Sequence, residues 1–221
     1  MKKIKLLGMK LQDRYARESL ILAERFLKQR AVNVILYLTT SVLLEAAENE
    51  EEKEWIEAAD ATLWGDTQIL KVAEITARGR ANEVEEKEFL KSFLRRMART
   101  HKSILVLADT EEQAQNLKEE LIRMQNGITV VGTMAIQDTE DSKEDIINEI
   151  NMIAPSVIMV RMPFSMQQKW LMQSRQYMNA GLWIGMPEDF SCIQKREMPM
   201  EKMGKRILNV IFSRKVNKYK K

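Results

Sequence analysis

Apolar and polar positions along the chain follow two periods, one typical of strands and one typical of helices. Short runs rich in β-branched and apolar residues are the strand candidates, and they cover residues 32–38, 61–64, 103–109, 128–135, 156–162 and 182–186. Between them, apolar residues recur at helical spacing over residues 10–30, 41–60, 68–77, 85–100, 111–125, 142–153 and 165–179. Strands that alternate with helices of this length form βαβ units. The pattern therefore predicts an α/β protein with a Rossmann-like, mostly parallel sheet and helices on both faces.

The ends of the predicted strands are the expected position of a binding site. Continuous apolar strands fit a sheet that is covered on both faces. In such sheets ligands bind beyond the carboxyl ends of the strands. The segments at these ends are residues 39–41, 65–67, 109–110, 133–135, 162–165 and 186–189.

The C-terminal segment has a pattern of its own. Its apolar residues recur at helical spacing, and they are Met203, Ile207, Val210, Ile211 and Val216. Residues 202–221 contain eight basic residues and no acidic one, so the net charge of +3 combines an acidic body with a basic tail. We therefore divide the chain into an α/β domain at residues 1–198 and a basic amphipathic appendage at residues 199–221. A helix of this kind lies on an anionic membrane or docks on its own molecule.

Composition excludes several classes of site. One cysteine, Cys192, excludes an internal disulfide and a cysteine-built zinc site, and one histidine, His101, excludes a histidine-rich metal site. The chain has neither of the two standard glycine-rich phosphate loops. No apolar run approaches the roughly 20 residues of a spanning helix, and no signal peptide leads the chain. We therefore expect a cytoplasmic protein that holds no metal.

Two strand ends carry groups capable of chemistry. Thr39, Thr40 and Ser41 follow the strand at 32–38, and their hydroxyls can bind a phosphate or a sugar. Asp66 follows the strand at 61–64, where a carboxylate can act as a general base or bind a sugar hydroxyl. The alternative for both segments is helix capping, because Ser, Thr and Asp are favoured N-cap residues.

A third candidate group begins the helix after the strand at 156–162. Gln167 and Gln168 place two side-chain amides in its first turn, where backbone N–H groups favour anions. The alternative is a polar first turn with Trp170 in the core. His101 and Cys192 are expected to have structural roles.

The order of elements and several motifs resemble the TagA/WecG/CpsF glycosyltransferases over nearly the whole chain. The segment at 4–8 (Ile-Lys-Leu-Leu-Gly) is similar to the start of the family. The segment at 39–41 matches the threonine of a threonine–any–asparagine motif, and that at 59–66 is similar to a strand that the family ends in aspartate-glycine. Residues 165–170 match a proline-lysine-glutamine-glutamate motif with a later tryptophan at Gln167 and Trp170. Residues 180–185 are similar to the next strand of the family.

The resemblance implies a particular reaction. Family members transfer a sugar, typically N-acetylmannosamine, from a UDP-sugar to a lipid-pyrophosphate-linked acceptor at the cytoplasmic membrane face. The polymer made is an envelope polysaccharide or teichoic acid. No metal or cofactor is implied beyond the UDP-sugar donor, and the partners implied are the polyprenyl-linked acceptor and the membrane. Self-association into a homo-oligomer is left open.

The resemblance also assigns residue roles. It implies Asp66 as the catalytic base. The residues to which it assigns substrate binding are Thr39, Ser41, Gln167, Gln168 and Arg175. A basic C-terminal segment contacts the membrane in the family, which implies such contacts for Lys205, Arg206, Arg214, Lys215 and Lys218.

Departures from the family pattern support a second hypothesis. Glu83 falls where the family has an arginine, Ala108 replaces a glycine, Ser165 replaces a proline and Gln168 replaces a glutamate. A pyrophosphate pocket that loses a cation binds its ligand less well. The chain is then a catalytically degenerate paralogue that serves as a binding or scaffold partner in envelope assembly.

A third hypothesis is an α/β module that binds nucleic acid through its tail. The acidic body and the absence of a recognised motif argue against nucleic acid.

Overall fold

The computed structural model describes residues 2–29, 31–137, 143–193 and 199–219. Within these residues, one sheet contains six parallel strands, which are β3 (Asn33–Leu38), β4 (Ala61–Trp64), β5 (Ser103–Ala108), β6 (Thr129–Ala135), β7 (Val157–Arg161) and β8 (Leu182–Met186). Each strand coincides with a predicted apolar run, and the α/β, Rossmann-like fold is confirmed.

The strand order places β8 between two halves of the sheet. The order is β4-β3-β8-β7-β5-β6, so the chain runs outward from β3 to β4 in one half and from β5 to β6 in the other. The direction of winding changes between these halves. Open α/β sheets bind ligands beyond the carboxyl ends of the strands at such a point. The fold therefore directs attention to the ends of β3, β4 and β8.

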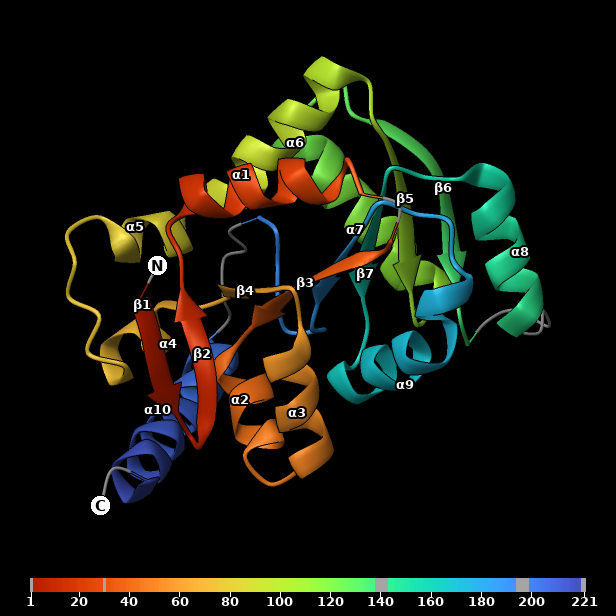
Figure 1. Cartoon of the computed structure of the whole chain (residues 1–221). Coiled ribbons are helices and arrows are strands. Elements are labelled where there is room, and N and C mark those ends of the chain that lie inside the picture. Colours follow the sequence, from red (N-terminus) through yellow and green to blue (C-terminus); the bar gives the residue numbers. More distant parts are fainter. Residues whose placement is uncertain (1, 30, 138–142, 194–198, 220–221) are drawn as a thin grey trace.

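Helices cover both faces of the sheet (Figure 1). The helices α1 (Ala16–Phe26), α6 (Glu88–Thr100) and α7 (Glu111–Met124) cover one face, and α2 (Thr40–Ala46), α3 (Glu50–Ala58), α8 (Lys143–Ile153) and α9 (Phe164–Ser174) cover the other. Successive residues of β3 enter opposite cores, with Leu36 and Leu38 on one side and Ile35 and Tyr37 on the other. Burial on both faces explains why the strands are apolar without alternation.

The prediction of one helix over residues 10–30 is wrong in its first part. A hairpin of β1 (Lys2–Leu6) and β2 (Met9–Asp13) precedes α1. Both residues of its turn, Leu7 and Gly8, have positive φ angles, which is the backbone that a tight two-residue hairpin requires. Met9, Leu11 and Asp13 are buried at every second position, as in a strand. This alternation directly precedes the helical pattern of α1 and merges with it in the sequence.

Three other predicted helices are divided. The stretch at 41–60 forms α2 and α3, because Asn49 accepts hydrogen bonds from the N–H groups of Glu51 and Glu52 and caps a new helix. The stretch at 85–100 begins within α5 (Arg80–Glu85) and continues as α6 after Lys87. The stretch at 165–179 comprises α9 and a 3₁₀ turn at Arg175–Tyr177. The helix predicted at 68–77 is the short α4 (Thr67–Val72).

The C-terminal segment forms one long helix, α10 (Pro199–Tyr219), beside α2 and α4. Phe212 and Val216 are buried in the same core as the sheet. Ser213 accepts a hydrogen bond from the Gln68 side chain at 3.1 Å, and Lys215 pairs with Glu48. The helix therefore docks on its own molecule along one side.

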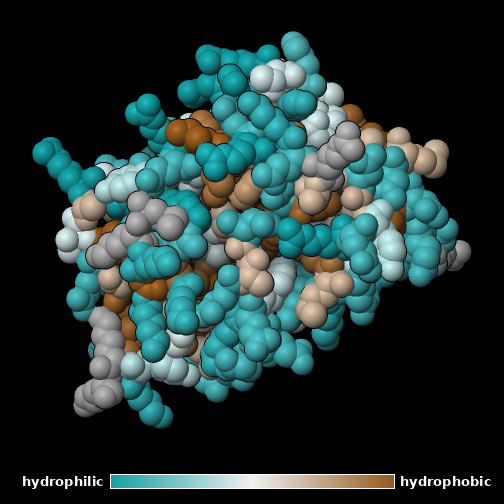
Figure 2. All heavy atoms as spheres, viewed as in Figure 1, coloured by the Kyte–Doolittle hydropathy of each residue, from teal (hydrophilic) through white to brown (hydrophobic). Residues whose placement is uncertain are grey.

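The opposite side of α10 remains exposed and partly apolar. Met203, Ile207, Val210 and Ile211 are between 49% and 60% exposed. On the face of the molecule drawn in Figure 2, by contrast, the surface is mainly hydrophilic and its hydrophobic residues emerge in small separate patches. Among the described residues, no helix is long and apolar enough to cross a membrane.

Candidate functional site

A cluster of polar side chains lies at the carboxyl ends of β3 and β4 and in the loop after β8. Thr39 Oγ1 donates to Asp189 Oδ1 at 3.1 Å, and Ser41 Oγ donates to Asp189 Oδ2 at 2.5 Å. Asp66 Oδ1 accepts from the Thr40 hydroxyl at 2.9 Å, and its Oδ2 accepts from the Thr40 N–H at 2.6 Å. The tertiary structure therefore brings Thr39, Ser41 and Asp66 into one cluster.

Thr39 and Asp66 are also helix caps, as the alternative interpretation of the sequence predicted. Asp66 is the N-cap of α4 and accepts from the N–H groups of Gln68 at 3.0 Å and Ile69 at 3.3 Å. Thr39 is the N-cap of α2 and accepts from the Val42 N–H at 3.5 Å. The two carboxylate oxygens of Asp66 thus receive four hydrogen bonds from the protein itself.

Asp189 is a site residue that sequence reasoning did not single out. It lies in the segment 186–189, which was expected at the site because it follows a strand, but no motif marked the aspartate. Its side chain is exposed, whereas Asp66 is half-buried. Asp189 is therefore the carboxylate of the cluster that solvent or a substrate reaches most easily.

Gly65 keeps the cluster compact. A Cβ atom at this position would lie 2.8 Å from Thr39 Cγ2 and 3.0 Å from the carbonyl oxygen of Leu38. Both distances are shorter than carbon atoms tolerate without movement of the neighbour. The glycine therefore permits the ends of β3 and β4 to approach each other, and Thr39 lies directly beside it.

Lys87 is the second site residue that the sequence did not reveal. It caps the start of α6 with a left-handed backbone, and its Nζ atom donates to the carbonyl oxygen of Gly65 at 2.8 Å. The ammonium lies 4.4 Å from the centre of the Phe190 ring. Burial lowers the pKa of Lys87, because the charged form loses contact with water.

Gln167 and Gln168 are buried and bound to backbone atoms. The Gln167 amide donates to the carbonyl oxygens of Met162 at 2.9 Å and Met186 at 2.8 Å, and so joins the carboxyl ends of β7 and β8. Gln168 donates to the carbonyl oxygen of Glu51 at 3.0 Å. Gln167 therefore lies at the expected edge of the sheet, but its side chain is only 1% exposed.

Arg175 lies away from this cluster. It donates to the carbonyl oxygen of Val32 and to Asp60, both at 2.8 Å, and these residues precede β3 and β4. The amino ends of parallel strands are at the opposite edge of the sheet from their carboxyl ends. The structure therefore corrects the grouping of Arg175 with Thr39 and Asp66. The contacts of Arg175 instead connect the segments that precede β3 and β4.

The predicted membrane-contact residues differ in their surroundings. Lys205, Arg206, Arg214 and Lys218 are exposed, whereas Lys215 is half-buried and paired with Glu48. The charge of Lys205 also contributes to lowering the pKa of Lys87, because like charges repel.

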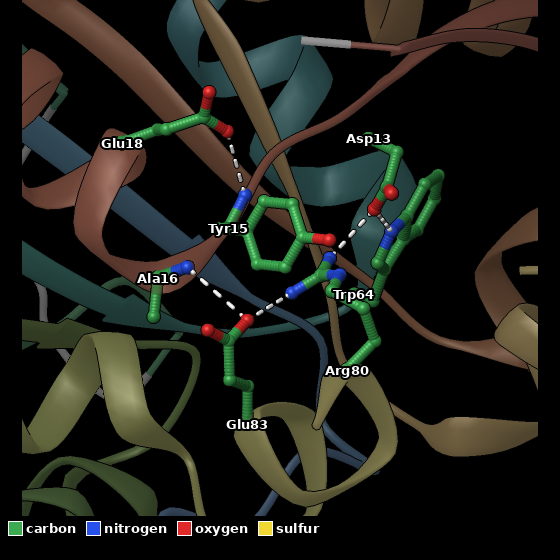
Figure 3. Close-up of polar contacts among 7 residues, drawn as sticks. All are labelled: Asp13, Tyr15, Ala16, Glu18, Trp64, Arg80 and Glu83. Atoms are coloured by element: carbon green, nitrogen blue, oxygen red, sulfur yellow. Dashed lines mark hydrogen bonds and ion pairs between the residues drawn. The ribbon is translucent and has the colours of Figure 1, made fainter. Parts of the chain in front are cut away.

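Glu83 belongs to a buried ion-pair network beside the cluster (Figure 3). Arg80, which is 3% exposed, donates to Asp13 Oδ1 at 2.6 Å and also pairs with Glu83. Asp13 Oδ1 accepts in addition from the indole N–H of Trp64 at 2.8 Å. The charge of Glu83 is thus engaged by Arg80, and the network joins the N-terminal hairpin to α5 and to the end of β4.

A second buried ion pair fixes the loop that carries Asp189. Arg161, at the end of β7, donates to Glu120 of α7 at 2.6 Å, and the same carboxylate accepts from the Cys192 N–H at 3.0 Å. Burial raises the pKa of the Cys192 thiol to about 12. The thiol is therefore protonated at neutral pH and unsuited to nucleophilic chemistry.

The comparison with family models identifies the class of protein. The model of the glycosyl transferase WecG/TagA/CpsF family matches residues 4–195, and the chain therefore belongs to this family. Membership implies a glycosyltransferase that acts in cell-envelope polysaccharide synthesis. A search of curated proteins found no match.

Proposed function

We propose that this protein transfers N-acetylmannosamine or a similar hexose from a UDP-sugar to a lipid-pyrophosphate-linked acceptor. The product would enter a cell-envelope polysaccharide or a teichoic acid. The observation that carries the proposal is the convergence of Thr39, Ser41, Asp66 and Asp189 at the carboxyl ends of the strands in a chain of this family. Hydroxyls and carboxylates in such a position bind sugar hydroxyls. A carboxylate can also accept the proton of an attacking hydroxyl.

Two carboxylates are available to deprotonate the acceptor hydroxyl. Asp66 is the base that the family resemblance implies, and it binds Thr40. Asp189 binds the neighbouring residues Thr39 and Ser41. A general base must come within hydrogen-bond distance of the proton that it removes. Asp66 meets this condition when the acceptor hydroxyl replaces the Thr40 hydroxyl at Oδ1. Asp189 meets it from its exposed position in the loop after β8.

The substrate class suggests a position at the membrane surface. A polyprenyl-linked acceptor keeps its pyrophosphate at the lipid headgroups, so the enzyme must approach the membrane. The exposed side of α10 combines apolar residues such as Ile207 and Val210 with the cations Lys205, Arg206 and Arg214. Helices with this combination lie in the interface of anionic membranes. We therefore propose peripheral attachment through α10 at the cytoplasmic face.

A degenerate paralogue that acts as a scaffold is the second candidate function. The observation that favours it is that the Asp66 carboxylate already accepts four hydrogen bonds from the protein, two from the start of α4 and two from Thr40. In this candidate function Asp66 has a structural role only. Glu83, which stands at the position of a family arginine, is likewise engaged by Arg80.

Turnover decides between the two functions. The purified protein is incubated with UDP-N-acetylmannosamine and a short-chain prenyl-pyrophosphate-linked N-acetylglucosamine, and release of UDP is measured with and without the acceptor. Acceptor-dependent release that is lost in Asp66→Asn supports transfer with Asp66 as the base, and loss in Asp189→Asn alone assigns the base to Asp189. Binding of the lipid-linked acceptor without any UDP release would favour the scaffold.

A further inference from the structure

A small pocket beside the polar cluster is lined by more cations than carboxylates. It lies between the start of α1, the ends of β3 and β4, and the junction of α5 and α6. Its lining includes three cationic side chains, Arg14, Arg80 and Lys87, and one carboxylate, Glu83. The question is which of these charges are neutralised within the protein.

The two terminal nitrogen atoms of the Arg80 guanidinium pair with neighbouring carboxylates, whereas its Nε atom has no hydrogen-bond partner among the described residues. Figure 3 shows its guanidinium between Asp13 and Glu83, with the Tyr15 ring beside it. The distance from the Arg80 Cζ atom to the centre of that ring is 4.9 Å. The two negative charges of Asp13 and Glu83 more than offset the single positive charge of Arg80, so Arg80 and its partners together carry no net positive charge.

Lys87, by contrast, makes no ion pair with any residue that the structure describes. Its ammonium group donates one hydrogen bond, to the Gly65 carbonyl oxygen, and rests on the Phe190 ring. The remaining two N–H donors have no partner in the described part of the chain. A largely buried ammonium without an ion-pair partner is costly, and the carboxylates of Asp66 and Asp189 offset that cost only from a distance. Such groups occur where a ligand supplies the opposite charge.

The backbone at Lys87 adds to this cost. Its φ angle is 54°, in the left-handed region that side chains other than glycine seldom adopt. The helix that it caps receives no hydrogen bond from the Lys87 side chain. The N–H groups in the first turn of α6 therefore lack a side-chain cap, and Phe89 of this turn also lines the pocket. Uncapped N–H groups at a helix start attract anions.

Tyr37 supplies an independent sign of a missing partner. It lines the same pocket and is 3% exposed, yet its hydroxyl has no hydrogen-bond partner among the described residues. Its ring lies 4.3 Å from the Phe190 ring, on which Lys87 also rests. A buried phenol without a partner loses free energy that a ligand oxygen would restore.

We propose that Lys87 and the Tyr37 hydroxyl bind the pyrophosphate group of a substrate in this pocket. The proposal rests on the proposed function, because both substrates of that reaction carry a pyrophosphate. The two unpartnered N–H groups of Lys87 and the phenolic O–H are donors, and the phosphoryl oxygens are acceptors. Lysine binds phosphate as a point charge, so it needs no bidentate geometry. Arg14, which hydrogen-bonds only to Gln12 among the described residues, adds positive charge at the rim.

Calorimetric titration of the full-length protein tests this assignment. The probes are UDP for the donor, geranyl pyrophosphate for the acceptor, and uridine as a ligand without phosphate. The variants are Lys87→Met, Tyr37→Phe and, as a matched control on the same helix, Lys91→Met, whose lysine is exposed and paired with Glu86. We expect Lys87→Met to weaken binding of at least one pyrophosphate by about tenfold or more, because a charge-assisted hydrogen bond is lost. Tyr37→Phe should weaken pyrophosphate binding less, and Lys91→Met should leave it unchanged. None of the variants should change the affinity for uridine.

The two pyrophosphate probes identify the source of the ligand. A loss confined to UDP assigns the pocket to the donor, and a loss confined to geranyl pyrophosphate assigns it to the acceptor. Unchanged affinity of Lys87→Met for both, or no binding of either by the wild type, overturns the proposal. A thermal melt without ligand tests for a merely structural lysine. Removal of a buried charge that has no ion-pair partner should leave the melting temperature unchanged or higher, and a clearly lower melting temperature of Lys87→Met would indicate a structural role instead. Pyrophosphate binding through Lys87 without sugar transfer would refute only the proposed function.

Discussion

Asp66 joins the starts of two helices through a single carboxylate. It caps α4 through the N–H groups of Gln68 and Ile69, and it holds Thr40 at the first residue of α2. The same atoms are the candidates for removing a proton from the acceptor. A substitution at this position therefore changes both stability and chemistry, and the two effects have to be separated.

The pair Asp66→Ala and Asp66→Asn separates them. The alanine variant should lower the free energy of unfolding by about 1–2 kcal/mol, because the cap is lost. The asparagine variant keeps an oxygen for the helix N–H groups and should lose less, as measured by urea unfolding. Asn49→Ala, which removes the cap of α3 far from the cluster, should cost a similar amount and leave UDP release unchanged. An unaltered unfolding midpoint for Asp66→Ala would show that the cap contributes little.

The ionisation of Lys87 should make the free energy of unfolding depend on pH. Its pKa is lowered in the folded protein, chiefly by burial, and the charged or titratable groups around it are Asp66, Asp189, Cys192 and Lys205. Below the lowered pKa both states carry the charge, so the cost of burying it is fully present. As pH rises from that value towards the unfolded pKa of about 10.4, the unfolded state binds more protons and stability increases.

The matching measurement compares the wild type with Lys87→Met between neutral pH and pH 10 or so. The free energy of unfolding of the wild type should rise relative to that of the variant across this range. A difference between the two proteins that stays constant with pH would contradict the assignment of a buried ammonium without an ion-pair partner.

At the scale of elements, α10 has two sides with different surroundings. One side buries Phe212 and Val216 against α2 and α4. The other carries the exposed apolar residues and the cations Lys205 and Arg206. The residues that dock α10 therefore differ from those proposed to contact a membrane, and the two groups can be altered separately.

Charge reversal on the exposed side should weaken membrane binding. The double variant Lys205→Glu/Arg206→Glu is expected to lose about 2 kcal/mol or more of affinity for vesicles that contain anionic lipid. Sedimentation with vesicles at low and high salt measures the effect, which should shrink as salt increases. Lys102→Glu is the control, because this exposed lysine precedes β5 at the opposite edge of the sheet. Equal sedimentation of all three proteins would count against attachment through α10.

The contact between β8 and α9 leaves no space for an added methyl group. A Cβ atom at Gly185 would overlap the side-chain oxygen of Gln167 and lie 3.0 Å from Leu36 Cδ2. Gly185→Ala should therefore lower the free energy of unfolding by about 1–3 kcal/mol through overpacking. Gly204→Ala is the matched control, since nothing lies within 4 Å of its position on α10 and alanine favours a helix. A midpoint of Gly185→Ala equal to that of the wild type would show that Gln167 moves aside freely.

For the whole molecule, the ion pair of Arg161 and Glu120 connects parts that are distant in the sequence. It joins the end of β7 to α7, and Glu120 also holds the backbone at Cys192, just after Asp189 and Phe190. The position of the loop in the polar cluster therefore depends on a charge pair between a strand and a helix that are distant from the loop in the sequence.

Breaking this pair should be more harmful than replacing it. Glu120→Leu leaves a buried guanidinium without its carboxylate and is expected to lose about 3–5 kcal/mol of unfolding free energy. The double variant Glu120→Leu/Arg161→Met should recover part of that loss, because neither charge is then buried. Chemical unfolding of the two single variants and the double variant measures the coupling. Additive losses would show that the two side chains do not stabilise the fold as a pair.

The sequence by itself determined the strands, the fold class and the family. Each strand is a local run of apolar residues, such as 103–108, whose burial on both faces requires no knowledge of the neighbours. The same local information placed Thr39 and Asp66 at strand ends. It missed β2, because the alternation of Met9, Leu11 and Asp13 merges with the helical pattern that follows.

Only the tertiary structure decided which polar groups meet. Asp189 reaches Thr39 across 150 positions of sequence because β8 lies next to β3 in the sheet. Lys87 reaches Gly65 because α6 packs on the face from which Tyr37 projects. Arg175 was grouped with the site by motif, and strand direction placed it at the opposite edge. Strand order and helix packing follow from the fit of the whole core, so short segments do not encode these encounters.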